Sequence, residues 1–121
     1  MALWTDPEGR GEEHMILVRA IVRPEKADHV MKEASEAGFQ AVTKMDVYGR
    51  GKQKGITVGE IHYDEIPKEM LLFFCNDEDK DDLVKVILRT ARTGEGNYGD
   101  GRIFISPIED AYTVSTGKKG L

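Results

Sequence analysis

The spacing of apolar residues along the chain changes in an order that occurs twice. Residues 15–23 form a compact run rich in Ile and Val, which predicts a buried strand. Pro24 stands where a helix can begin, since a first-turn N–H would have no helical partner. The next apolar residues recur every three or four positions and share one helical face: Ala27, Val30, Met31, Ala34 and Ala37. Gly38 ends this helix, and residues 39–48 are predicted to form a second strand.

The second half of the chain repeats this order. Residues 68–76 are predicted to form a strand, and residues 77–92 a helix that begins with acidic side chains. The apolar face of this helix comprises Leu83, Val84, Ile87, Leu88 and Ala91. A glycine-rich loop at 93–101 leads to a strand at 102–106, which residues 108–114 extend or flank. Two strand–helix–strand units predict an α+β, ferredoxin-like fold with both helices on one face of an antiparallel sheet.

Two segments do not follow the repeat. Residues 49–67 contain clustered glycines and cations without a lasting period, which predicts a long surface loop, or a hairpin with short arms. Unstructured loops of this length are uncommon in compact domains unless they have a function. Residues 1–14 have few core-forming side chains, and we expect them to be a disordered N-terminal extension. Residues 15–121 then form one domain.

Composition narrows the class of protein. The chain has 121 residues and a formal charge of −5, which argues against a general nucleic-acid binder. Its one cysteine, Cys75, lies in an apolar run and is expected to be a buried thiol. We find no signal peptide and no apolar stretch that could span a membrane, so we expect a cytoplasmic protein. The three histidines lack metal-ligand spacing, and no catalytic set is suggested, so we do not expect an enzyme.

Three short motifs combine small residues with cations. Residues 49–55 read Gly-Arg-Gly-Lys-Gln-Lys-Gly, and exposed backbone N–H groups beside three cations could bind an anion. Residues 93–102 read Thr-Gly-Glu-Gly-Asn-Tyr-Gly-Asp-Gly-Arg, which could cradle phosphates. Residues 116–120 read Thr-Gly-Lys-Lys-Gly. Taken singly, a solvated basic hairpin, a tight helix–strand connection and a solvated tail explain them equally well or better.

Together these motifs resemble the PII nitrogen-regulatory family, from residue 15 to residue 120. Ile-Val-Arg-Pro-Glu-Lys at 21–26 is similar to the family's first strand and helix start, and residues 49–55 to the base of its T-loop. Ile-Pro-Lys at 66–68 resembles the return of that loop. Thr-Ala-Arg-Thr-Gly at 90–94 with Gly-Asp-Gly-Arg-Ile-Phe at 99–104 resembles the B-loop, and Thr-Gly at 116–117 the C-loop.

The resemblance implies a trimeric signal transducer that binds ATP or ADP in clefts between subunits, with magnesium and 2-oxoglutarate on the phosphates. The implied nucleotide site comprises Thr43, Gly49, Lys52, Gly99, Asp100, Gly101 and Arg102. The implied 2-oxoglutarate site comprises Gly51, Lys52, Gln53 and Lys68, and Gln53 would also contact the magnesium ion. Ligands would then change which T-loop conformations are populated, and so the affinity for a partner.

Some features depart from the common bacterial members. The T-loop is shorter, Tyr63 is out of register with the uridylylated tyrosine, and residues 95–98 lengthen the B-loop. These features resemble the nitrogenase-associated subgroup, which implies a homotrimer, or a hetero-oligomer with a PII paralogue, that inhibits dinitrogenase. Thr113 and Ser115 replace the C-loop arginines, a loss that Lys118 or Lys119 would have to offset. The alternatives are a PII protein that regulates an ammonium transporter, or an acylphosphatase-like enzyme on the same fold.

Overall fold

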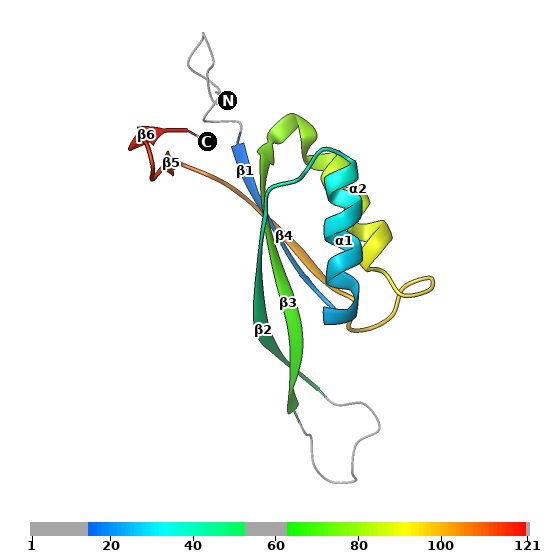
Figure 1. Cartoon of the computed structure of the whole chain (residues 1–121). Helices are drawn as coiled ribbons and strands as arrows, with labels where there is room; N and C mark the ends of the chain where they lie inside the picture. The colour runs from blue at the N-terminus through cyan, green and yellow to red at the C-terminus, as the bar shows by residue number, and fades with distance from the viewer. Residues whose placement is uncertain (1–14, 53–62, 121) are drawn as a thin grey trace, which may run out of the picture.

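The computed structural model describes residues 15–52 and 63–120. The main elements are β1 (Met15–Val22), α1 (Pro24–Glu36), β2 (Val42–Lys52), β3 (Tyr63–Asn76), α2 (Lys80–Ala91) and β4 (Gly101–Pro107). The four strands form one sheet in the order β2-β3-β1-β4, with every neighbouring pair antiparallel. Both helices lie against the same face of this sheet (Figure 1). The predicted ferredoxin-like architecture is therefore confirmed.

The hydrophobic core lies between the helices and the sheet. Alternate residues of β1 point into it, because successive side chains of a strand face opposite sides. The core includes Val18, Ala20, Leu71 and Phe73 from the sheet, Val30 and Ala34 from α1, and Leu83 and Ile87 from α2. Cys75 belongs to this core as predicted, and burial raises the pKa of its thiol to about 11, so the thiol is unreactive at neutral pH.

The segment between residues 49 and 67 corrects the prediction of a long loop. β2 continues to Lys52 and β3 begins at Tyr63, and these two residues are paired across the strands. Glycines and charges made both arms resemble a loop, but cross-strand pairing outweighs local propensity. The hairpin stem extends beyond the helices (Figure 1). Residues 53–62, which include Gln53, lie outside the described residues, as do residues 1–14.

Smaller differences concern the ends of elements. β2 begins at Val42 rather than at residue 39. The predicted helix at 77–92 is divided into a 3-10 turn (Asp77–Asp79) and α2. Residues 108–114 do not extend β4; instead β5 (Tyr112–Thr113) pairs with β6 (Lys118–Lys119) in a separate sheet. This β5–β6 arm stands away from the main sheet, on the side opposite to the helices (Figure 1). In the described part of the chain, neither helix is long and apolar enough to cross a membrane.

One face of the main sheet is not covered by any described element. Its strands present large apolar side chains there, including Met45, Phe74 and Phe104, which are 41%, 43% and 47% exposed. Leu17, Ile21, Met70 and Leu72 lie on the same face by strand register and are partly buried. A contiguous apolar face of this kind usually marks an interaction surface.

Two carboxyl groups meet where the hairpin leaves the body of the sheet. Asp46 on β2 is paired directly with Glu69 on β3, and Glu69 is only 9% exposed. The Lys44 Nζ atom lies 3.5 Å from Glu69 Oε1 and 3.9 Å from Asp28 Oδ1 on α1. The pKa of Glu69 is raised, mainly by a hydrogen bond with Asp46 and by burial, and Lys44 opposes this shift.

We expect Glu69→Gln to change how stability depends on pH. Folding raises the pKa of Glu69, so the folded state holds the proton more tightly than the unfolded chain does. The stability contributed by that proton is present below the ordinary carboxyl pKa and is lost as pH rises through the raised pKa. Urea unfolding at pH 4 and pH 8, at constant protein concentration, should show the variant gaining stability over wild type as pH rises. The control is Glu65→Gln, at an exposed position of the same strand. Parallel pH profiles for wild type and Glu69→Gln would contradict the assignment.

Candidate functional site

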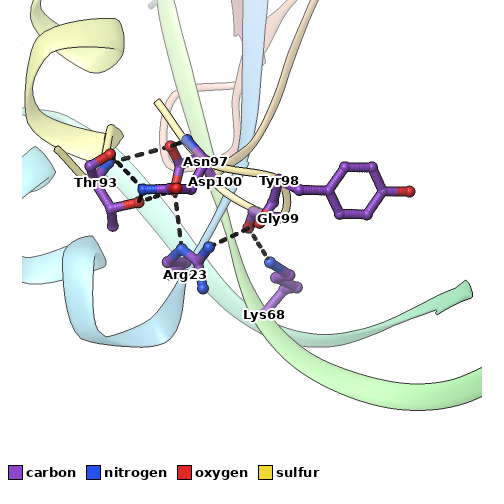
Figure 2. Close-up of polar contacts among 7 residues, drawn as sticks. All are labelled: Arg23, Lys68, Thr93, Asn97, Tyr98, Gly99 and Asp100. Atoms are coloured by element: carbon purple, nitrogen blue, oxygen red, sulfur yellow. Dashed lines mark hydrogen bonds and ion pairs between the residues drawn. The ribbon is translucent and has the colours of Figure 1, made fainter. Parts of the chain in front are cut away.

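The loop between α2 and β4 folds around the carboxylate of Asp100 (Figure 2). Thr93 donates to it twice, from its backbone N–H to Oδ2 at 3.1 Å and from its hydroxyl to Oδ1 at 2.6 Å. The backbone N–H of Asn97 donates to Oδ2 at 2.8 Å, and the Arg23 guanidinium donates to Oδ1 at 3.0 Å. Bonds that favour the charged form lower the pKa of Asp100 far below its usual range, with the Thr93 hydroxyl contributing most and the Asn97 N–H next.

Further bonds fix the tip of the loop. The side-chain amide of Asn97 donates to both the carbonyl and the hydroxyl oxygen of Thr93, each at 2.8 Å. Arg23 also donates from Nη2 to the Tyr98 carbonyl at 2.9 Å. The ring of Tyr98 points away from this network (Figure 2) and is 80% exposed. The loop is therefore held by side chains of the loop itself and of the residue that precedes α1.

Glycine is required at the two positions that flank Asp100. Gly101 has a φ of +125°, and a Cβ there would lie 1.9 Å from the Ile21 carbonyl oxygen. Gly99 has a φ of +94°, and a Cβ there would lie 3.3 Å from Arg23 Nη2. An L side chain rarely adopts such a backbone conformation, and at Gly101 it would also collide with β1. The lack of side chains therefore lets the loop pass close to β1 and Arg23, while both glycines stay exposed to solvent.

The root of the hairpin contacts this loop through Lys68. Its ammonium group extends from β3 and donates to the Gly99 carbonyl (Figure 2). Gly49 lies beside it, since a Cβ on that residue would approach Lys68 Cγ to 3.8 Å. The pKa of Lys68 is lowered, mainly by burial and then by the nearby Arg23 charge. Two neighbouring cations that bind only a carboxylate and backbone carbonyls form a site where a further anion would be favoured.

A groove of about 350 Å³ runs along α2 and β4 beside the loop. Its walls are mostly apolar and comprise Val22, Val84, Ile87, Leu88, Ala91, Ile103 and Ile105. Arg92, Asp100, Gly101 and Arg102 line it as well. Arg102 is exposed and makes no hydrogen bond or ion pair with any described residue. An unpaired guanidinium beside open glycine backbone is suited to a phosphate.

Known proteins are similar to this chain over most of its length. The family model for nitrogen regulatory protein P-II matches residues 15–118. The chain belongs to the PII family. The "nitrogen fixation nifHD region GlnB-like protein 1" of Methanobacterium ivanovii is 56% identical over 107 residues, 88% of this chain and all of the relative. The P-II protein 2 of Methanothermobacter thermautotrophicus is 39% identical over 84% of this chain and 90% of the relative. These relatives confirm the predicted resemblance to the nitrogenase-associated PII proteins.

Solved structures agree on the fold. The B. subtilis GlnK–ATP complex superposes with a TM-score of 0.74 at 24% identity, over 90% of this chain and 94% of that one. Arabidopsis thaliana PII bound to citrate gives a TM-score of 0.72 at 27% identity, over 89% and 87%. Because PII proteins are regulatory signal transducers, this chain is one too, and it is not an enzyme. The acylphosphatase-like alternative is therefore wrong.

In PII terms, the structure brings much of the predicted site together. Lys68 of the T-loop base binds the B-loop at Gly99, with Gly49 beside Lys68, and Asp100, Gly101 and Arg102 follow directly in the chain. Gly51 and Lys52 lie farther out on the stem, paired with Asp64 and Tyr63. Thr43 is paired with Leu72. It lies six residues from Gly49 along β2, so the two residues are roughly 20 Å apart. Gln53, the predicted magnesium ligand, lies outside the described residues.

Sequence reasoning missed the residues that hold the B-loop in shape. Arg23, Thr93 and Asn97 provide the bonds to and around Asp100, and the sequence analysis gave none of them a role. The available signal was a cation at the end of a strand, directly before Pro24. Asp100 itself was assigned to nucleotide contact, whereas its carboxylate is directed into the loop.

We expect Asp100→Asn to destabilise the protein at neutral pH. An amide in this position turns an NH₂ group toward donors that need an acceptor. Because folding lowers the pKa of Asp100, the stabilisation is present above the ordinary carboxyl pKa of about 3.9 and is lost as pH falls toward the lowered value. Urea unfolding followed by circular dichroism should show a clear gap between wild type and variant at pH 7 and a smaller gap at pH 3. Glu95→Gln, an exposed acid of the same loop, serves as control and should match wild type at both pH values. A gap that does not change with pH would contradict this role.

Proposed function

We propose that this PII protein senses ATP or ADP together with 2-oxoglutarate and controls a nitrogen-metabolism target through its T-loop, residues 49–67. The observation that carries the proposal is the contact of Lys68 with the Gly99 carbonyl. It joins the root of the T-loop to the B-loop within one site. A ligand that binds at this junction alters both loops together.

The nucleotide phosphates are proposed to bind the B-loop. Gly99 and Gly101 are exposed to solvent, and Arg102 offers a guanidinium without a partner among the described residues. B. subtilis GlnK, which shares the fold, was solved in complex with ATP. The described residues contain no cluster of three or more His, Cys, Asp or Glu side chains suited to a metal. Magnesium is accordingly proposed to be held by the ATP phosphates, 2-oxoglutarate and Gln53, an oxygen-rich set of the kind it prefers.

The 2-oxoglutarate carboxylates are proposed to bind Lys68 and the backbone near Gly51 and Lys52. The lowered pKa of Lys68 supports this, because an anion there would relieve the repulsion from Arg23. Arabidopsis PII, at 27% identity, was solved with citrate, which is also a polycarboxylate. When Lys68 turns to a ligand carboxylate, it releases Gly99, and the T-loop root is freed from the B-loop.

The working form is proposed to be a trimer, or a hetero-oligomer with a PII paralogue. The uncovered apolar face of the sheet supports assembly. Thr43 is remote from Gly49 on its own strand, so we propose that it serves a cleft completed by another subunit. The same arrangement explains how a chain of 121 residues gains enough buried surface.

Titration calorimetry tests the ligand assignment. Wild type should bind Mg-ATP, and 2-oxoglutarate should bind in its presence. Lys68→Gln should weaken 2-oxoglutarate by about tenfold or more while ATP binding largely persists, since it removes one charge-assisted contact. Arg102→Gln should weaken ATP by a similar factor. Lys85→Gln, an exposed cation on α2, is the control and should bind both ligands like wild type. Wild type that binds neither ligand would overturn the sensing function, and equal loss of both in each variant would overturn the assignment.

The target is proposed to be dinitrogenase, inhibited until 2-oxoglutarate binds. The support is the set of relatives named for the nitrogen fixation nifHD region. Deletion of residues 56–64 should abolish capture of dinitrogenase in a pull-down and leave the assembly intact, because the deleted segment lies beyond most of the hairpin stem. Dinitrogenase captured by the wild-type protein should be released when Mg-ATP and 2-oxoglutarate are added. If the deletion variant still captured dinitrogenase in a 2-oxoglutarate-sensitive way, the T-loop mechanism would be contradicted. If wild type captured an ammonium transporter and not dinitrogenase, the transporter would be the target.

A further inference from the structure

The described charged side chains on the uncovered face of the main sheet are all of one sign. Strand register places the following residues on this face: Leu17, Arg19 and Ile21 on β1; Lys68, Met70, Leu72 and Phe74 on β3; and Arg102 and Phe104 on β4. Among the described side chains there, the charged ones are Arg19, Lys68 and Arg102, and none is acidic. The chain as a whole carries a formal charge of −5, so this face departs from the average surface.

The proposed function accounts for two of these three cations. Lys68 is assigned to 2-oxoglutarate and Arg102 to phosphate. Arg19 is left, in the middle of β1, paired with Leu72 on one side and Phe104 on the other. It is exposed and makes no hydrogen bond or ion pair with any described residue. If apolar faces meet in the assembly, this guanidinium loses water and needs an acid from outside its own sheet.

The segment after β4 contains a matching acid. Residues 101–120 include two acidic residues, Glu109 and Asp110, at the base of the β5–β6 arm. The Asp110 carboxylate already binds Lys119, with Oδ1 and Nζ 3.0 Å apart. Glu109 is exposed and has no partner among the described residues. The arm stands away from its own sheet on the side of the uncovered face (Figure 1), which is the face that the proposed assembly would bury.

We propose that Arg19 forms an ion pair with Glu109 of an adjoining copy of this chain and so fixes how the subunits meet. This inference rests on the assembly in the proposed function and adds a specific contact to it. Apolar side chains such as Phe74 and Phe104 supply attraction without direction. A guanidinium that must meet one carboxylate selects a single orientation of the neighbouring subunit and excludes others.

Charge exchange tests the pair. Light scattering over a range of protein concentrations should show Arg19→Glu and Glu109→Arg each raising the concentration of half-dissociation by roughly tenfold or more. The double variant Arg19→Glu/Glu109→Arg should return it close to wild type. Lys85→Glu makes the same change of charge at an exposed position of α2, on the opposite side of the sheet from the uncovered face. This variant should leave assembly unchanged. Glu109 is exposed in the segment between β4 and β5, where a substitution should not disturb folding. If Arg19→Glu folds poorly, Glu109→Arg therefore still tests the pair.

The outcomes separate the two proposals. Wild type that is monomeric at micromolar concentration would overturn both the assembly and the ion pair. An assembled wild type whose Arg19→Glu variant behaves like Lys85→Glu would overturn the ion pair alone. Failure of the double variant to regain assembly, with both single variants folded by circular dichroism, would also overturn it, because the two side chains would then act separately.

Discussion

Hydrogen bonding to the Asp100 carboxylate is the interaction on which the proposed ligand site depends. The loop from 93 to 100 includes three glycines, which are costly to order because each loses much backbone freedom. One carboxylate binds two N–H groups, a hydroxyl and a guanidinium and thereby fixes this loop. Charge-assisted bonds of this kind are stronger than neutral ones. Gly99 and Gly101 stay exposed to solvent while the acid between them is directed inward.

Electrostatics differ between the two sides of the sheet. On the helix side, Asp46 and Glu69 meet at the hairpin root and bring excess negative charge, which Lys44 partly offsets. On the other side, Arg19 and Arg102 are unpaired among the described residues. Lys68 and Arg23 gather at the junction of the T-loop and B-loop. The junction therefore offers two cations to an anion, although the chain as a whole carries a net negative charge.

The sequence predicted the repeated strand–helix–strand order because the periods of the core residues are local and clear. Val30, Ala34, Leu83 and Ile87 were placed on helical faces from spacing alone, and all four are buried. A hairpin was one of two alternatives from the sequence, but the extent of its paired stem was not predicted, because that stability comes from pairing across strands and the glycines and charges are typical of loops. The role of Arg23 was missed because it depends on contacts with Asp100 and Tyr98, which are more than 70 residues away in the sequence. Gly99, Asp100 and Lys68 were assigned to the site by resemblance, since no single local pattern distinguishes a phosphate cradle from a turn.

The length of the stem makes the T-loop a lever. From Asp46 to Lys52 the paired strands extend roughly 20 Å beyond the root. A rotation of about 10° at that root would displace the end of the stem by roughly 3.5 Å on this length. A displacement of that size breaks hydrogen bonds, which fail within a few tenths of an ångström beyond about 3.2 Å. If a ligand binds Lys68 as proposed, the geometry of a stiff ribbon would amplify that single contact into lost contacts with a bound partner.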